Sequence, residues 1–145
     1  MGDWLFGCDI CQQVCPWNVR FATAKGDPVF QARPFLERPD AGRFLSLDDD
    51  TYRQALRASP LKRAKRRGLA RNAAVALGNQ GDPQDIQTLS RALTEDPEPL
   101  VRAHAAWALG RMGVESGRVA LIEAQERELE PAVLQEIEAA LGPHP

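Results

Sequence analysis

The tripeptide Ala-Leu-Gly occurs three times in the second half of this 145-residue chain, and its regular spacing limits the possible folds. The copies begin at Ala76, Ala108 and Ala140, so the spacing is 32 residues both times. Apolar residues precede each copy at matching positions, at i, i+4, i+7 and i+8, which lie on one face of an α-helix. These stripe residues are Leu69, Ala73, Ala76, Leu77; Val101, Ala105, Ala108, Leu109; and Val133, Ile137, Ala140, Leu141.

Second helices are expected between the copies. The predicted helices cover 83–94, with Ile86, Leu89 and Leu93 inward, and 115–128, with Val119 and Ile122 inward. The glycine that closes each tripeptide is expected to end its helix in the left-handed conformation. A helix pair repeated about every 30 to 40 residues is typical of an α-solenoid. Accidental recurrence in an alanine-rich chain would not reproduce four stripe positions and a glycine together.

The sequence divides into four zones. A cysteine segment covers 1–18, and a proline-broken connector with one short helix, N-capped within Asp48–Asp50, covers 19–58. The solenoid is predicted over 59–142, where Ser59-Pro60 is expected to start a helix. Residues 143–145 form a short tail that we expect to be frayed.

Three cysteines lie within eight residues, as C-x2-C-x3-C-P at Cys8, Cys11 and Cys15. An odd number so closely spaced is a poor disulfide framework, whereas thiolates are soft ligands for zinc or iron–sulfur clusters. The sequence lacks a second Cys/His pair for zinc, and the Cys-Pro ending matches the bacterial ferredoxin run C-x2-C-x2-C-x3-C-P. Leu5 stands where that run has its first cysteine, so further ligands must come from elsewhere. Iron–sulfur ligation is favoured over zinc and over buried structural cysteines.

A basic run follows the connector, with six cations in ten positions and no acidic residue from Ser59 to Asn79. The run consists of Lys62, Arg63, Lys65, Arg66, Arg67 and Arg71. Pairing within the helix cannot neutralise it, which favours binding to nucleic-acid phosphates. Ion pairs with Asp48–Asp50 or with the acidic later repeats, and plain solvation, remain alternatives. Arg102 is a candidate extension of the positive surface.

The distribution of apolar residues argues against a membrane-spanning protein. No apolar run approaches the roughly 18 residues that span a bilayer, and residues 1–12 lack the pattern of a signal peptide. We therefore expect a cytoplasmic protein with no membrane partner.

Two stretches resemble known families. VRAHAAWALGRMG resembles short HEAT repeats, and the likeness extends over 60–142. GDWLFGCDICQQVCPWN, followed by SPLKRAKRRGLARNAAVALGN, is similar to the C-terminal part of epoxyqueuosine reductases. These are cobalamin-dependent iron–sulfur enzymes that reduce epoxyqueuosine to queuosine at the wobble position of tRNA. The resemblance implies a mostly α protein, in which a partial ferredoxin-like iron–sulfur segment precedes a short HEAT-type solenoid.

The resemblance also implies roles for individual residues. Cys8 and Cys11 would ligate one [4Fe-4S] cluster and Cys15 a second, with the remaining ligands upstream, and Cys8 and Asp9 would approach the cobalamin. The basic run would contact tRNA around the anticodon stem-loop. The family's catalytic domain is absent, so no catalytic residue is assigned, and we expect a fragment that is inactive alone. The alternative is a non-enzymatic HEAT interaction module whose cysteine segment is vestigial or binds zinc.

Overall fold

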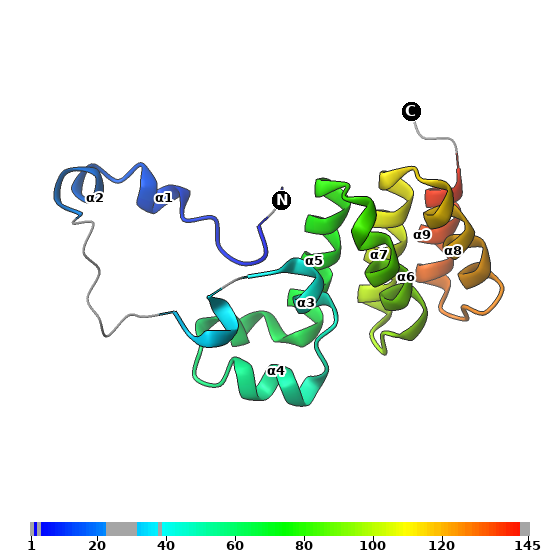
Figure 1. The fold of residues 1–145 in the computed structure, drawn as a ribbon, viewed down its shortest axis with the longest axis horizontal. Helices are drawn as coiled ribbons and strands as arrows, with labels where there is room; N and C mark the ends of the chain where they lie inside the picture. Colours follow the sequence, from blue (N-terminus) through cyan, green and yellow to red (C-terminus); the bar gives the residue numbers. More distant parts are fainter. Residues whose placement is uncertain (1, 3, 23–31, 38, 143–145) are drawn as a thin grey trace. The chain divides into compact units, whose positions relative to one another are not determined.

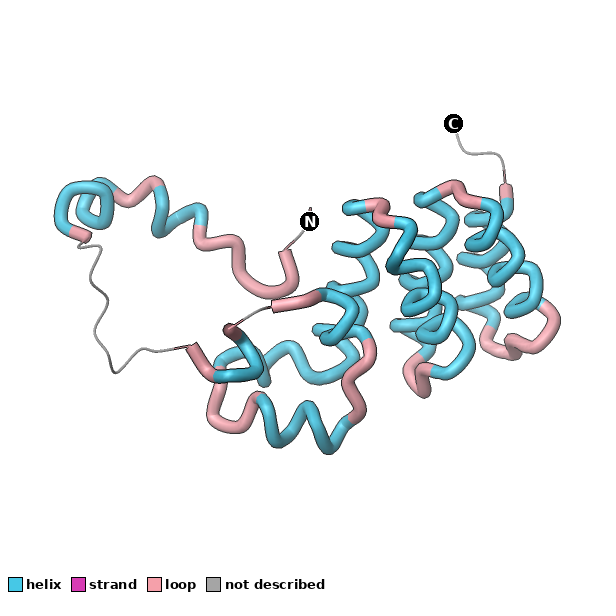
Figure 2. Tube along the Cα trace, in the orientation of Figure 1, coloured by secondary structure: helices cyan, strands magenta, loops and turns pink. Residues whose placement is uncertain are grey.

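A computed structural model describes residues 2, 4–22, 32–37 and 39–142. These described residues form helices joined by loops, without strands (Figure 2). The chain divides into two compact units, one of residues 1–6 with 40–145 and one of residues 7–39. The predicted tail at 143–145 and the connector residues 23–31 and 38 lie outside the described residues.

The larger unit is a stack of helix pairs (Figure 1). Its elements are α3 (Ala41–Leu45), α4 (Asp49–Ala55), η3 (Pro60–Ala64), α5 (Lys65–Gln80), η4 (Pro83–Asp85), α6 (Ile86–Glu95), α7 (Pro99–Met112), α8 (Glu115–Gln125) and α9 (Pro131–Leu141). Helix α7 packs between α5 and α9, while α6 contacts both α3 and α8. Helices α5, α7 and α9 therefore form one layer, and α3, α6 and α8 form the other. The predicted α-solenoid is confirmed.

The predicted stripe forms the core of the larger unit. Its members on α5 and α7 are all almost completely buried, as are Val133 and Ile137 on α9. Leu141, at the end of the last copy, is half-buried. The helices between the copies add Leu89 and Leu93 to this core, as expected, whereas Ile86 is half-buried. Burial of this apolar face, rather than helix propensity, stabilises the stack.

Gly142 is the C-cap of α9 as predicted, with φ −68° rather than a left-handed value, but the other two glycines of the repeated tripeptide have a different role. Gly78 and Gly110 lie inside α5 and α7, whose C-cap residues, three positions further on, are Gly81 and Gly113, with φ of 68° and 64°. A Cβ at Gly78 would lie 2.8 Å from Cα of Ala108, and one at Gly110 would lie 2.6 Å from Cβ of Ala140. The glycines are therefore contact points between stacked helices. The predicted C-cap role was wrong for both.

The inward face predicted for α8 was also wrong. Val119 and Ile122 are 46% and 44% exposed, whereas Gly117, Leu121 and Ala124 are buried. The buried set has the spacing i, i+4, i+7, and two of its three members are small. A Cβ at Gly117 would lie 3.4 Å from the Leu109 side chain. Close approach to α7 therefore decides the orientation of α8, and the larger apolar side chains are left outside.

Residues 40–58, which the sequence places in the connector, belong to the larger unit. Helix α3 takes the position of a first outer helix, so the solenoid has three helix pairs: α3/α5, α6/α7 and α8/α9. Apolar side chains of this stretch are buried: Phe44, Leu45, Leu47, Tyr52 and Leu56. Asp40 and Asp48 cap α3 and α4 by accepting hydrogen bonds from the backbone N–H groups of Gly42 and Thr51.

The smaller unit contains α1 (Ile10–Gln13), α2 (Pro16–Phe21) and the short η2 (Pro34–Leu36). No ferredoxin-like arrangement is visible among its described residues. The two helices are linked by Asn18, whose Nδ2 donates to the backbone oxygen and to Oε1 of Gln12, at 3.1 and 2.5 Å. None of the residues in α1 or α2 is buried.

Candidate iron–sulfur segment and nucleic-acid interface

The three cysteines lie in or next to the two short helices of the smaller unit. Cys8 precedes α1, Cys11 lies within it, and Cys15 is the N-cap residue of α2. All three are free thiols, with Cys8 and Cys11 exposed and Cys15 half-buried. Asp9 adopts a left-handed conformation, and its backbone oxygen accepts hydrogen bonds from the N–H groups of Gln12 and Gln13.

The thiolates of the three cysteines are the right kind of ligand for an iron–sulfur cluster, but there are too few of them. Three thiolates are soft ligands, and a [4Fe-4S] cluster needs four. Within the described residues, no three Cys, His, Asp or Glu side chains are grouped closely enough to hold a metal ion. These cysteines can therefore contribute ligands, but they do not form a complete cluster site.

Large apolar side chains of the smaller unit are exposed to solvent. Trp17 and Phe21 stack on each other, with ring centroids 5.5 Å apart, and both remain more than half exposed. The other exposed members are Ile10, Val14 and Val19. Such a surface around the cysteines is typical of a segment that packs against further polypeptide.

Arg66, one of the six predicted RNA contacts, is instead buried in the larger unit. Its NH1 and NH2 donate to the two carboxylate oxygens of Asp96, at 2.9 and 2.8 Å. NH1 also donates to the backbone oxygen of Leu47, and Nε lies 3.7 Å from Asp49. The side chains of Arg66 and Asp96 are each only 7% exposed. The intramolecular alternative therefore holds for Arg66, and we withdraw it from the candidate RNA contacts.

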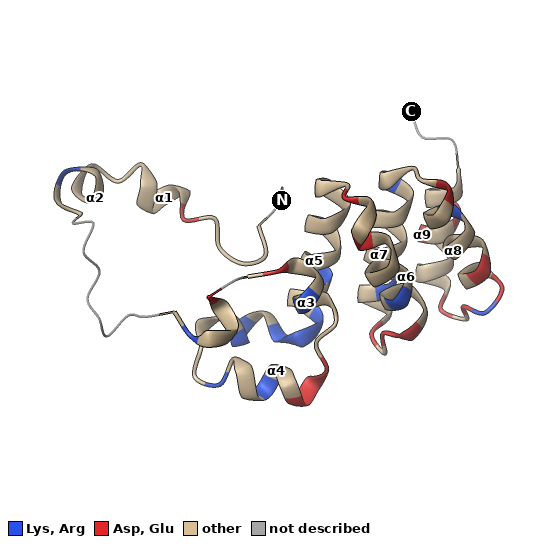
Figure 3. Cartoon of the chain, in the orientation of Figure 1, with Lys and Arg blue, Asp and Glu red and all other residues tan. Residues whose placement is uncertain are grey.

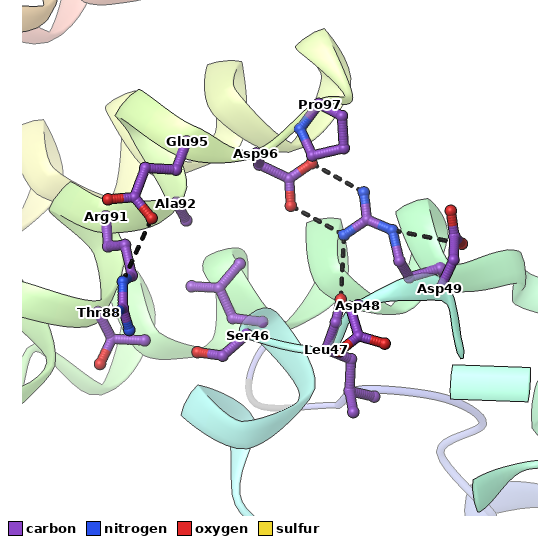
Figure 4. Close-up of a pocket in the computed structure, with 12 residues that line it drawn as sticks. Ser46, Leu47, Asp48, Asp49, Thr88, Arg91, Ala92, Glu95, Asp96 and Pro97 are labelled. Atoms are coloured by element: carbon purple, nitrogen blue, oxygen red, sulfur yellow. Dashed lines mark hydrogen bonds and ion pairs between the residues drawn. The ribbon is translucent and has the colours of Figure 1, made fainter. Parts of the chain in front are cut away.

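The Arg66–Asp96 pair lines a cavity of about 370 Å³ between the α3–α4 turn and α6. Figure 4 shows Asp96 and Asp49 on opposite sides of the guanidinium group that both contact, which is that of Arg66. The hydrogen bonds to Asp96 raise the pKa of Arg66 further above its usual range, although burial acts in the opposite direction. A bidentate pair of this kind fixes geometry as well as charge. It ties the start of α5 to the end of α6.

A second ion pair repeats this arrangement one helix pair later. Arg102, near the start of α7, donates from Nε and NH2 to the carboxylate of Glu128, at 2.7 and 3.0 Å. Its NH1 donates to the backbone oxygen of Asp96. Arg102 is therefore a structural residue rather than an extension of the positive surface. Sequence reasoning missed Asp96 and Glu128, although each lies in the acidic turn before the next repeat helix.

The other basic residues lie around a break between two helices. Lys62 and Arg63 are on η3, while Lys65 and Arg67 are on the first turn of α5; all four are exposed. The sequence predicted one continuous helix, but Lys65 has φ 59° and ψ 163°, which separates the two. Tyr52 holds the break in place, because its hydroxyl donates to the backbone oxygen of Lys62 at 3.0 Å.

These exposed cations are close together in the sequence, and Figure 3 shows the blue Lys and Arg segments that precede and begin α5. Lys62, Arg63 and Lys65 have no ion pair with another described residue, and Arg67 is 3.9 Å from Glu98, at the edge of ion-pair distance. Arg71, about one turn beyond Arg67 on α5, is half-buried. We call Lys62, Arg63, Lys65 and Arg67 the basic surface.

Comparison with known proteins agrees with this architecture. The family of HEAT repeats matches residues 58–142. The chain belongs to the HEAT-repeat family. This match begins just before η3 and ends with α9, so it covers the α5–α9 part of the solenoid. No described helix of this HEAT-repeat chain is long and apolar enough to cross a membrane.

Curated relatives extend the similarity beyond the HEAT repeats. Epoxyqueuosine reductase from Pseudomonas aeruginosa is 38% identical over 113 residues, covering 78% of this chain and 31% of that protein. The enzyme of the same name from Bacillus cereus is 30% identical over 141 residues, covering 97% of this chain and 37% of that protein. The HEAT-repeat chain thus spans about a third of the length of the curated relatives it matches.

Solved structures of epoxyqueuosine reductases are also similar to this chain over nearly its whole length. A crystal structure of epoxyqueuosine reductase with an epoxyqueuosine-modified tRNA-Tyr stem loop matches with a TM-score of 0.85 and 28% identity. The Bacillus subtilis epoxyqueuosine reductase matches with a TM-score of 0.81 and 27% identity. Each match covers 97% of this chain and 37% of the other.

Proposed function

We propose that this chain is the C-terminal third of an epoxyqueuosine reductase. The observation that carries the proposal is the extent of the similarity, since one relative and two solved structures of that name match 97% of the chain, cysteine segment included. In the complete enzyme the reaction reduces the epoxide of epoxyqueuosine to the alkene of queuosine in tRNA. The chain holds three of the cluster ligands and a tRNA-docking surface, while the other ligands and the catalytic groups lie upstream.

The cysteines supply part of two ligand sets. Cys8 and Cys11 each contribute a thiolate to one [4Fe-4S] cluster, and Cys15 contributes one to a second. The exposure of Cys8 and Cys11 supports this role, because a ligand must be reachable by a cluster whose other ligands lie on another part of the polypeptide. The clusters supply electron transfer when bound. Cys8 and the neighbouring Asp9 lie next to the cobalamin in this proposal.

The exposed apolar side chains around the cysteines support an upstream partner. Trp17, Val19 and Phe21 are all more than half exposed on the short helix that follows Cys15. In the complete enzyme they pack against the upstream catalytic domain. The relatives are long enough to contain it, since this chain covers only 31–37% of them.

The basic surface docks tRNA through phosphate contacts around the anticodon stem-loop. Its four side chains project from a break that Tyr52 and the Arg66–Asp96 pair hold in place. Arg71 adds a fifth, half-buried cation to the same helix. Lys62, Arg63 and Lys65 have no acidic partner among the described residues and can bind phosphate without first breaking an ion pair, and the affinity falls as salt rises. One matched structure is an epoxyqueuosine reductase with a modified tRNA stem loop, which supports this assignment.

Metal analysis tests the proposal. Coexpression with the upstream region under anaerobic conditions should yield about eight irons per complex, as two [4Fe-4S] clusters require. Changing Cys8, Cys11 and Cys15 together to serine should remove this iron. One zinc per chain, or no metal with the upstream region present, would instead favour a non-enzymatic HEAT interaction module with a vestigial or zinc-binding cysteine segment.

A further inference from the structure

Two asparagine side chains on α5 hold the first residues of the chain. Nδ2 of Asn72 donates to the backbone oxygen of Leu5 at 2.7 Å, and Nδ2 of Asn79 donates to that of Gly2 at 2.8 Å. These bonds join residues 67 and 77 positions apart in the sequence. They explain why residues 1–6 belong to the larger unit although the residues directly after them do not.

The spacing of the two bonds shows how the segment lies on the helix. Seven residues of α-helix separate Asn72 from Asn79 and rise about 10.5 Å. The backbone oxygens of Gly2 and Leu5 therefore contact α5 in the order opposite to the helix direction. Leu5 lies nearer the end of α5 that carries Lys65 and Arg67, and Cys8 follows Leu5 by only three residues.

The asparagines are not explained by packing alone. Oδ1 of Asn72 is buried without a hydrogen-bond partner among the described atoms. Because an unpaired buried acceptor is unfavourable, a side chain that served only the fold would be apolar at this position. The amide is useful there for its N–H group, which satisfies the backbone oxygen of Leu5, a residue outside the described helices.

We propose that Asn72 and Asn79 are positioning residues that anchor the chain just before Cys8 onto the helix that carries the basic surface. This anchor fixes Gly2 and Leu5, which precede Cys8 in the chain, on the helix that also carries Lys65 and Arg67. The inference rests on the proposed function for its catalytic consequence, but the anchor itself can be measured without any activity.

A distance measurement tests the anchor directly in the chain. Spin labels are placed at Phe6→Cys and Gln80→Cys after the three native cysteines are changed to serine. The parent protein should give one narrow distance distribution. Asn72→Asp with Asn79→Asp should broaden it, because a carboxylate cannot donate and repels the backbone oxygen it faces. The matched control is Gln87→Glu, the same amide-to-acid change at an exposed position of α6, which should leave the distribution narrow.

The fold of each variant is checked by its helical circular dichroism. If the double variant does not fold, Asn79→Asp alone is measured, since Asn79 lies one residue before the last residue of α5. A broad distribution in the parent, or an unchanged one in a folded aspartate variant, would overturn the anchor.

Kinetics of the complete enzyme, with the upstream region present, test the positioning role. Asn72→Asp with Asn79→Asp should lower kcat about 10-fold or more with KM for tRNA unchanged, because small misplacements of reacting groups are costly in rate. If kcat is unchanged although the spin-label distance distribution is broadened, the positioning role is overturned and the proposed function is left intact. A parent enzyme without reductase activity would refute the proposed function, and the distance measurement would still decide the anchor.

Discussion

Arg66 and Asp96 form a bidentate ion pair across 30 residues of sequence, and each side chain is only 7% exposed to solvent. The pair lies where α5 begins and α6 ends, next to the backbone oxygen of Leu47. Arg66, a member of the basic run, therefore fixes the start of α5, the helix that carries its neighbours Lys65 and Arg67.

Removing the acidic partner should destabilise the fold strongly. Asp96→Ala removes the bidentate partner of a buried guanidinium and leaves only the longer contact with Asp49, so the expected loss is about 3 kcal/mol in the free energy of unfolding. Urea unfolding followed by circular dichroism measures it. The control is Asp50→Ala, which breaks the exposed Arg53–Asp50 pair and should cost less than about 1 kcal/mol. Equal effects of the two substitutions would contradict a structural role for the buried pair.

The close approach of α5 and α7 at Gly78 predicts that even one methyl group is harmful there. Gly78→Ala places a Cβ 2.8 Å from the backbone of Ala108, and the strain should cost about 1–3 kcal/mol. Gly68→Ala, in the same helix, is the matched control. Its Cβ meets Ala64 at an ordinary 3.7 Å, so this change should stabilise the helix by about 0.5–1 kcal/mol. Opposite signs in thermal unfolding are therefore expected, and a neutral Gly78→Ala would argue against so close an approach of the two helices.

The Arg102–Glu128 pair predicts loss of stability in acid. The hydrogen bonds from Arg102 lower the pKa of Glu128 below its ordinary value of 4.5, against the effect of burial. Because the folded-state pKa is the lower one, the pair stabilises the fold fully above pH 4.5, and this contribution is lost as the pH falls through the folded-state value. Glu128→Gln should therefore flatten the dependence of unfolding free energy on pH below 4.5. A curve that stays as steep as the parent's would refute this linkage.

Charge removal at the basic surface should weaken RNA binding in a salt-dependent way. Lys62→Ser, Lys65→Ser and Arg67→Ser together should reduce the slope of log K against log salt by about 0.7–0.9 for each phosphate that is no longer neutralised. Fluorescence anisotropy with a labelled anticodon stem-loop measures this slope. Arg91→Ser, at an exposed ion pair on α6, removes a positive charge elsewhere and serves as the control. The same slope in the parent and the triple variant would exclude RNA docking at this surface.

Much of the fold was predictable from local pattern. The 32-residue period and the stripe positions identify the helices, because the side chains of residues four and seven apart in a helix lie on one face whatever surrounds it. The stripe residues on α5 and α7 are all buried, and the solenoid follows from their recurrence. Metal ligation by Cys8, Cys11 and Cys15 is also predicted from the chemistry of thiolates, and it stays a prediction that metal analysis tests.

Tertiary structure decided everything that depends on distance between helices. Gly78 is a contact glycine rather than a cap because Ala108 approaches it, and α8 turns Val119 outward because small residues allow a closer fit. Arg66 is buried because Asp96 reaches it from the next helix pair. A sequence pattern specifies which residues share a helix face, but the partner of a charge and the closeness of two backbones are set only when separate helices pack together.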